Sequence, residues 1–304
     1  MAQTAEFEEK EYEQPLNIEL LFDRQNLLWP PGQVFEEHFG IDAAMYSGDP
    51  RLWMMFGYPD IPNGVILDHF HWGYIWRQVG SRRQLPTFRT NLLLQTKRPE
   101  HRLGNNASYA KHGIAGQYWQ FHLTVHQQEA LEKLHRVLNN RALVCYASPA
   151  FHLQSDLFTH ITNRELVDNS TFVQVQRLTN HEKWVYNQAG TNGIACSEIE
   201  NISDKPFRDL IAIASENNNS NDNTLDNLTS LEKGSLQATE QLNEKNPIKN
   251  EFIKRRQRII EAFSNNDNEK TTSAARAFWT FRTFCMLTNT TWLPIGQSKT
   301  AANN

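Results

Sequence analysis

The sequence predicts an α/β protein in which helices flank a mixed β-sheet. Strand-like runs occur near residues 87–98 and 118–124, an amphipathic helix covers 127–139, and an apolar strand follows at 142–147. Apolar residues in the helix recur at i, i+3, i+4 and i+7, a spacing that places them on one face. Strands followed by a helix and another buried strand are typical of a sheet with helices packed against it.

The remaining elements are predicted from the same patterns. A helical pattern covers 4–28, where a Trp-Pro-Pro-Gly sequence ends it, and a short strand is expected at 41–46. An aromatic-rich segment at about 43–87 is predicted to be an insertion before the next strand. A further helix is expected near 155–162 and a further strand at 170–175.

Composition divides the chain into four parts. Residues 1–214 are predicted to form the α/β domain. Residues 215–250 contain nine Asn and no aromatic residue, so they offer little apolar area to offset their ordering entropy and are expected to be a flexible linker. Residues 251–296 are predicted to be a C-terminal helical segment, and 297–304 a tail.

The bulk composition is that of a globular protein. The chain has 304 residues, of which 39% are hydrophobic and 21% charged, and it contains no apolar run long enough to span a bilayer. The acidic start lacks the apolar core of a secretory signal, so a cytoplasmic location is expected. The cysteines Cys145, Cys196 and Cys285 show no CxxC spacing, which favours reduced structural thiols over a zinc ribbon or a disulfide framework.

Charge is distributed unevenly along the chain. The formal net charge is −4, which gives no general indication of a polyanionic partner. One segment is nevertheless basic and contains Arg77, Arg82, Arg83, Arg89, Lys97, Arg98 and Arg102 with the single acid Glu100. Such a concentration is expected either of a surface that contacts a phosphate backbone or of a solvated arginine-rich face.

The run NLLLQTKRPE, which begins at Asn91, changes abruptly from leucines to polar residues. Successive side chains of a strand alternate between its faces. Gln95 and Lys97 therefore share one face with Leu93. An amide and an ammonium group are predicted side by side at the end of this strand.

An acidic residue also occurs in the segment that precedes this strand. The sequence FEEHFGIDAAM places Asp42 on the short strand that begins just after a glycine. An Asp on one strand and Gln-x-Lys at the end of the next resemble the PD-(D/E)xK nuclease superfamily, most closely the Mrr-like restriction endonuclease branch, in which Gln replaces an acid. The resemblance covers about residues 5–150 and implies a restriction-endonuclease-like fold. Its main departure is the long segment between Asp42 and Gln95.

The resemblance implies a metal-dependent hydrolytic site. A divalent ion stabilises the charge that develops on a phosphate and lowers the pKa of the attacking water, and Mg²⁺ prefers oxygen ligands. Asp42 and Gln95 are expected to bind Mg²⁺ or Mn²⁺. Lys97 is expected to orient the water and to offset negative charge on the phosphate.

Family members often add a glutamate from the first helix. Glu13, which follows Tyr12, resembles the aromatic-Glu pair of the Mrr-like first helix. Glu36 and Glu37 are rivals because they lie close to Asp42 in the sequence. Glu13 is thus a candidate catalytic residue, and Glu36 a candidate metal ligand.

Nucleic acid is the partner that the resemblance implies. Arg82, Arg83 and Arg98 are predicted to contact its phosphates, and nearby aromatic residues offer stacking surfaces. The leading hypothesis is a DNA endonuclease of restriction or anti-phage defence. The alternatives are a catalytically inactive, nuclease-like subunit that binds nucleic acid or acts as an adaptor, and an assembly protein whose C-terminal helices bind a protein partner. Homodimerisation is left open.

Overall fold

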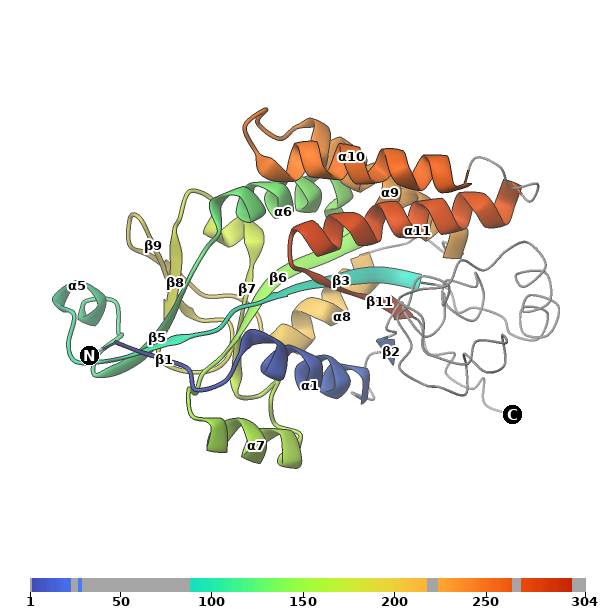
Figure 1. The fold of residues 1–304 in the computed structure, drawn as a ribbon. Coiled ribbons are helices and arrows are strands. Elements are labelled where there is room, and N and C mark those ends of the chain that lie inside the picture. Colours follow the sequence, from blue (N-terminus) through green and yellow to red (C-terminus); the bar gives the residue numbers. More distant parts are fainter. Residues whose placement is uncertain (1, 23–26, 29–87, 218–223, 264–268, 297–304) are drawn as a thin grey trace, which may run out of the picture.

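The computed structural model describes residues 2–22, 27–28, 88–217, 224–263 and 269–296. These residues form two β-sheets with helices packed around them (Figure 1). The predicted α/β class is confirmed. No described helix has the length and apolar character needed to cross a membrane.

The first sheet has five strands and contains the Gln-x-Lys strand. Its order is β2 (Leu27–Leu28), β11 (Thr291–Gly296), β3 (Phe88–Thr96), β6 (Ala142–Pro149) and β7 (Ser170–Gln174). β3 runs parallel to β6, and the other neighbours are antiparallel. The sheet is therefore mixed, as predicted, and both edges of β3 are paired with described strands.

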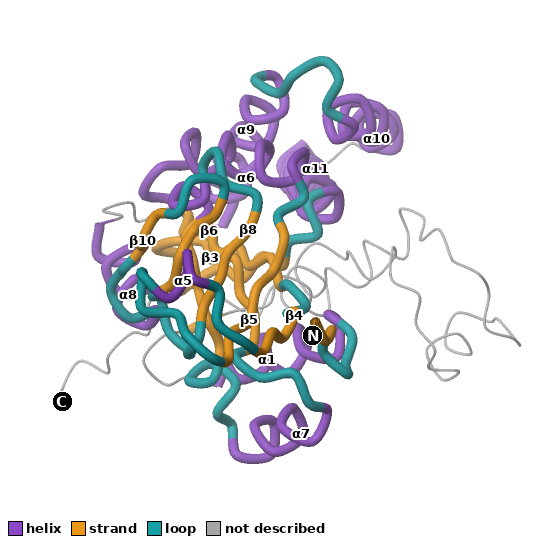
Figure 2. Tube along the Cα trace, turned by 90° about the vertical axis from the view of Figure 1, so that its left-hand side faces the viewer, coloured by secondary structure: helices purple, strands orange, loops and turns teal. Residues whose placement is uncertain are grey.

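The second sheet has six strands that are antiparallel throughout. In sheet order the strands are β1 (Ala2–Thr4), β4 (Glu100–Leu103), β5 (Gln117–His122), β8 (Lys183–Tyr186), β9 (Gly193–Cys196) and β10 (Glu200–Ile202). Apart from β1, the strands follow one another in sequence order. Figure 2 shows this sheet facing the viewer, with the short helix α5 (Ala107–Ala110) beside it.

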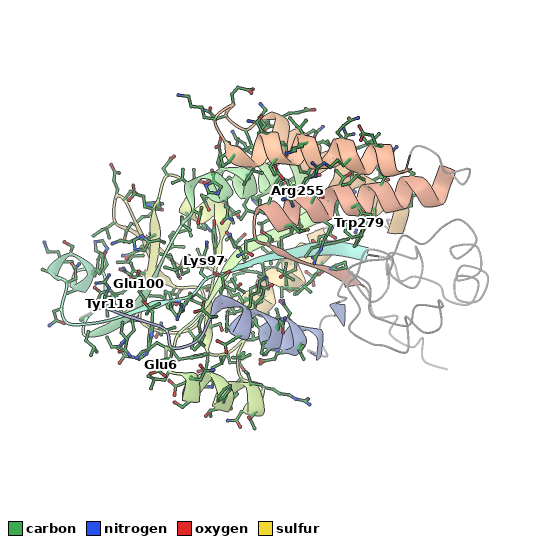
Figure 3. All side chains as sticks on the ribbon, viewed as in Figure 1. Glu6, Lys97, Glu100, Tyr118, Arg255 and Trp279 are labelled. Atoms are coloured by element: carbon green, nitrogen blue, oxygen red, sulfur yellow. The ribbon has the colours of Figure 1, made fainter. Side chains whose placement is uncertain are left out.

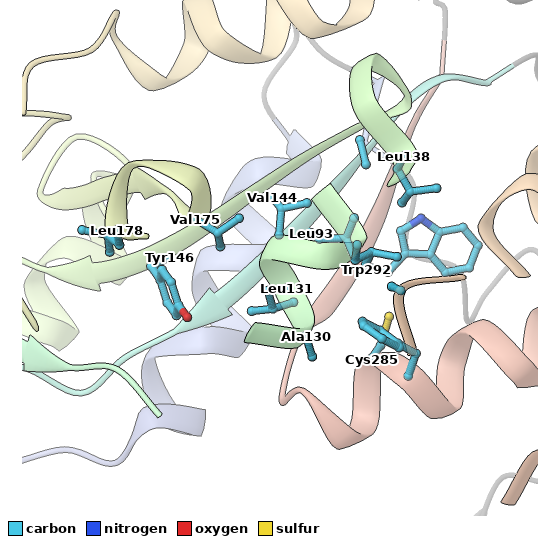
Figure 4. Close-up of a cluster of buried hydrophobic side chains, with 14 of the residues drawn as sticks. Leu93, Ala130, Leu131, Leu138, Val144, Tyr146, Val175, Leu178, Cys285 and Trp292 are labelled. Carbon is cyan, nitrogen blue, oxygen red and sulfur yellow. The ribbon is translucent and has the colours of Figure 1, made fainter. Parts of the chain in front are cut away.

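Four helices cover one face of the five-stranded sheet (Figure 1). They are α6 (Val125–Leu138), α9 (Thr224–Glu240), α10 (Pro247–Phe263) and α11 (Glu269–Leu287). The predicted apolar stripe of α6 is confirmed, because Ala130, Leu131 and Leu134 are fully buried. They belong to a large apolar cluster that also contains Leu93 and Trp292 (Figure 4).

Three other helices lie toward the opposite side: α1 (Glu9–Phe22), α7 (Gln154–Asn163) and α8 (Phe207–Asn217). A second apolar cluster joins them to the sheet through the leucines of β3 and β6 that point this way. Short 3-10 turns follow α6 at Asn139–Arg141 and β7 at Val175–Leu178. The central sheet is thus enclosed on both faces.

The predicted linker at 215–250 is wrong for most of its length. Its residues 224–240 form α9, in which Leu228, Leu231 and Ala238 are fully buried. Composition misled the prediction because a few well-spaced leucines are enough to pack a helix, even among many polar residues. Asn246 ends the next loop by capping α10, since its Oδ1 accepts a hydrogen bond from the Ile248 amide at 3.0 Å.

The predicted C-terminal helical segment at 251–296 also requires correction. It contains most of α10 and all of α11, but it ends in the strand β11, which pairs with β3 along residues 291–296. The segment is therefore part of the central sheet, and it is no extension beyond the domain. The three cysteines are free and buried, as expected.

Candidate functional site

The candidate site lies where β3 ends. Just past the strand, the Lys97 amide donates to Ala147 O at 2.8 Å, and the Ser148 hydroxyl donates to Lys97 O at 2.9 Å. These bonds continue the pairing with β6 and fix the backbone at Lys97. Figure 3 shows Lys97 beside the first turn of α1, whose Glu9 interacts with it.

The predicted alternation of side chains along β3 is confirmed. Leu93 joins the cluster beneath α6, whereas Leu92 and Leu94 join the cluster beneath α1. The polar residues that follow keep the same alternation. Gln95 contacts α6, and Thr96 contacts α1.

Gln95 is fully buried and only partly hydrogen-bonded. Its Nε2 donates to Gln127 Oε1 at 2.7 Å and to Thr288 O at 2.8 Å. Its Oε1 accepts no hydrogen bond from any described residue. Leaving a buried acceptor unsatisfied costs about 1–3 kcal/mol, so this oxygen is suited to bind a further group.

Lys97 is half-buried against an aromatic ring. Its Nζ lies 5.7 Å from the centroid of the Tyr146 ring, within the range of a cation–π contact. Burial lowers the pKa of Lys97, and the nearby Glu9 carboxylate partly opposes this shift. The Tyr146 hydroxyl in turn donates to Gln128 Oε1 at 2.6 Å, which holds the ring in place.

Glu13 lies at the site on α1, as predicted. Its Oε2 accepts from Lys10 Nζ at 2.6 Å and from the Thr96 hydroxyl at 3.2 Å, and its Oε1 accepts from the Thr291 hydroxyl at 2.6 Å. The carboxylate is almost fully buried. It therefore joins α1 to β3 and β11.

Glu9 is a further carboxylate of the site that the sequence analysis did not single out. Its Oε1 accepts from Asn289 Nδ2 at 2.7 Å, and the Thr96 hydroxyl lies 3.5 Å away. Burial raises the pKa of Glu9, while Lys97 and the bond from Asn289 partly oppose the rise. Its position four residues before Glu13, which places both on one helix face, is the signal that could have identified it.

The turn between α11 and β11 supplies contacts that the sequence analysis also missed. α11 ends in a Schellman motif, in which Thr290 N donates to Cys285 O at 2.8 Å and Asn289 N donates to Met286 O at 3.3 Å. Asn289 adopts the left-handed conformation that this motif needs, with φ of 49°. No local pattern predicts that this turn meets Gln95, which lies 193 residues from Thr288 in the sequence.

The other predicted site residues are Asp42, Glu36, Glu37, Arg82 and Arg83, and all lie outside the described residues. Asp42 therefore stays a predicted ligand, but the expectation that its strand is the direct neighbour of β3 is wrong, because β11 and β6 pair with the two edges of β3. In the described part of the chain, the antiparallel neighbour of β3 is β11.

Arg98 contacts the protein's own N-terminal segment. Its Nε donates to Ala5 O at 3.1 Å, and its Nη1 pairs with Glu8 Oε1 at 2.9 Å. The guanidinium group thus fastens the chain between β1 and α1. Its predicted contact with nucleic acid receives no support from this arrangement.

The residues that the structure describes fit a divalent ion only in part. None of their His, Cys, Asp and Glu side chains form a group of three or more suited to hold a metal. Gln95 Oε1 is a buried oxygen without a partner, which is a ligand type that Mg²⁺ accepts. The Glu9 and Glu13 carboxylates lie at the same end of β3.

Comparison with known proteins gave no match to a protein-family model, a curated protein or a solved structure. The function must therefore be inferred from the site's own residues.

Proposed function

We propose that the protein is a metal-dependent nuclease that hydrolyses phosphodiester bonds of DNA, in restriction or anti-phage defence. One observation carries the proposal. The end of β3 carries the unpartnered Gln95 oxygen and the Lys97 ammonium group, and its Thr96 contacts the first-helix carboxylates Glu9 and Glu13, of which Glu9 also acts on Lys97. An oxygen ligand, a cation and carboxylates are the groups that phosphodiester hydrolysis requires.

Several of these residues would hold the ion. Gln95 would contribute its side-chain oxygen, and Asp42 a carboxylate from the segment before β3. Glu13 and Glu9 would contribute charge, directly or through bound water. When bound, Mg²⁺ or Mn²⁺ would lower the pKa of the attacking water and neutralise charge on the phosphate.

Lys97 would act on the water and the phosphate. Its backbone is fixed by β6, its Nζ lies near the Tyr146 ring, and the Glu9 carboxylate interacts with its charge. An ammonium group held in this way offsets negative charge on a bound phosphate. Because burial lowers the pKa of Lys97, the group releases a proton more readily than an exposed lysine does.

Plasmid cleavage tests the proposal. Purified protein is incubated with supercoiled plasmid and Mg²⁺ or Mn²⁺, beside the variants Lys97→Ala and Asp42→Ala and the exposed control Lys111→Ala. We expect metal-dependent nicking or linearisation by the wild type and by the control. Each site variant should lose at least about 100-fold in rate. Undiminished cleavage by both site variants would refute the assignment.

A second candidate is a nuclease-like module that binds nucleic acid without cutting it. Both Glu13 oxygens already accept hydrogen bonds, and Lys97 packs against an aromatic ring, as expected of groups retained for structure. Salt-dependent DNA binding by the wild type without cleavage in any divalent metal would favour this candidate.

A further inference from the structure

The turn that follows α11 contacts three polar residues of the candidate site within four consecutive positions. Thr288 O accepts from Gln95, Asn289 Nδ2 donates to Glu9, and the Thr291 hydroxyl donates to Glu13. The Schellman motif fixes the backbone of this turn, and its register with β3 is fixed because Thr291 pairs with Leu94.

The Gln95 amide can adopt only one orientation among these neighbours. A primary amide has two N–H donors and one carbonyl acceptor. The groups facing Nε2 are both acceptors, the Thr288 carbonyl and Gln127 Oε1. Rotating the amide by 180° would place Oε1 against the Thr288 carbonyl, which has no proton to donate. The oxygen left without a partner is therefore always Oε1 on the opposite side.

We infer that the 288–291 turn and Gln127 are positioning elements of the metal site, which fix the Gln95 amide with its oxygen free for the ion. This inference rests on the proposed function. It assigns to the C-terminal segment a direct role in the site, and it gives a structural reason for an amide at position 95.

A glutamate at position 95 would suit this environment poorly. Both carboxylate oxygens are acceptors, and one of them would face the Thr288 carbonyl, whose position the helix cap holds. Gln127 has an N–H₂ group and can turn to donate, but a backbone carbonyl cannot. A carboxylate would attract a metal ion more strongly than an amide does. This gain is offset by repulsion from the Thr288 carbonyl and by the cost of burying a charge.

The test measures Mn²⁺ binding to the full-length protein by isothermal titration calorimetry, with no DNA present. The variants are Gln127→Leu, which removes the acceptor, and Gln127→Glu, which keeps one. Gln95→Glu adds a charge at the ligand itself. Asn289→Gly keeps the left-handed backbone but removes the bond to Glu9. Thermal melting of each variant shows that it is folded.

We expect Gln127→Leu to weaken Mn²⁺ binding by about tenfold or more, as loss of a partner that orients a metal ligand does, and Gln127→Glu to restore most of the affinity. Gln95→Glu should bind Mn²⁺ more weakly than the wild type despite its charge. Asn289→Gly should weaken binding while the protein stays folded. The Mg²⁺ concentration for half-maximal cleavage should follow the same order.

Two failures can be told apart. If the wild type binds Mn²⁺ but Gln127→Leu binds equally well and Gln95→Glu binds more tightly, the positioning role is wrong and the proposed function stands. If the wild type neither binds Mn²⁺ nor cleaves DNA with any divalent metal, the proposed function fails, and this inference fails with it.

Discussion

The two faces of the five-stranded sheet are covered differently, although one strand supplies polar groups to both. Toward α6, Gln95 meets an amide oxygen and a backbone carbonyl, and Lys97 meets an aromatic ring while the Glu9 carboxylate also acts on its charge. Toward α1, Thr96 meets the carboxylates of Glu13 and Glu9. Side-chain alternation along β3 thus directs Gln95 toward α6 and Thr96 toward the acids, while Lys97, just past the strand, interacts with Glu9.

This difference shows how the site is assembled. The α6 face holds a free acceptor and a cation in a largely apolar setting, and the α1 face holds buried negative charge. The turn at 288–291 contacts both faces, through Thr288 on one and through Asn289 and Thr291 on the other. Substitutions on each face separate their contributions.

The largest loss of stability is expected for a buried leucine of α9, on the α6 face of the sheet. Leu231 is fully buried there, so Leu231→Ala should lower the free energy of unfolding by about 2–5 kcal/mol. Urea denaturation followed by circular dichroism measures this loss. The control Leu103→Ala, at a leucine that is 63% exposed, should change little. Equal values for the two variants would mean that 224–240 behaves as the linker predicted from composition.

A buried polar network on the same face should give the next largest effect. Asn91 Oδ1 accepts from Trp292 Nε1 at 2.9 Å, and the amides of Asn91 and Asn227 bond to each other at 2.9 and 3.1 Å. Asn91→Leu removes these bonds and also the bond from Asn91 Nδ2 to Arg141 O at 3.0 Å. We expect a net loss of about 2–4 kcal/mol, because buried polar groups that lose their bonds cost about 1–3 kcal/mol each and the buried leucine side chain offsets part of this cost. Urea titration monitored by tryptophan fluorescence checks this. A loss as small as that of the exposed Asn140→Leu would contradict it.

A smaller effect is expected on the α1 face, where a matched pair of threonines exists on β3. The Thr96 hydroxyl donates to Glu13, whereas the buried Thr90 hydroxyl has no partner among the described residues. Thr96→Val should cost about 1.5–3 kcal/mol, the range for a bond to a charged group. Thr90→Val should cost nothing or stabilise the protein. Chemical denaturation of both variants decides this, and a larger loss for Thr90→Val would reverse our assignment.

The smallest effect concerns the pH dependence of stability. Burial raises the pKa of Glu9 above its ordinary value of 4.5, so the folded state favours the protonated carboxyl group. The wild type should therefore lose stability relative to Glu9→Gln as the pH rises from below 4.5 through the raised pKa. The amide oxygen of the substituted side chain can still accept the bond from Asn289, which keeps the comparison fair.

Denaturation of the two proteins between acid and neutral pH measures this difference. The lowered pKa of Lys97 gives a contribution that is lost as the pH falls through that pKa. This contribution is larger in Glu9→Gln, which lacks the carboxylate that opposes the shift of Lys97. A difference that shrinks as the pH rises would show that Glu9 is stabilised in its charged form.

Sequence patterns predicted the parts of the fold that depend on neighbouring residues. The apolar spacing of α6 and the alternation of β3 are local properties, and both were predicted correctly. The same alternation predicted that Gln95 and Lys97 share a face. Glu13 was placed at the site through the family resemblance, and the structure brings it to Thr96.

Contacts between distant parts of the chain were not predictable in this way. β11 pairs with β3 although about two hundred residues separate them, and the apolar run that forms it is short and contains Pro294. Thr288 meets Gln95 through a helix-capping turn, whose backbone geometry carries no signal about its tertiary partner. α9 was misjudged because average composition hides the spacing of its few leucines.

The most direct test of the central claim is the position of a bound ion in a crystal of the full-length protein soaked in Mn²⁺. Our account predicts a peak in the manganese anomalous difference map in contact with Gln95 Oε1, with the Gln95 amide nitrogen still bonded to Gln127 and Thr288. A map without such a peak, in which Oε1 accepts a hydrogen bond from Lys97 or another protein group, would contradict it.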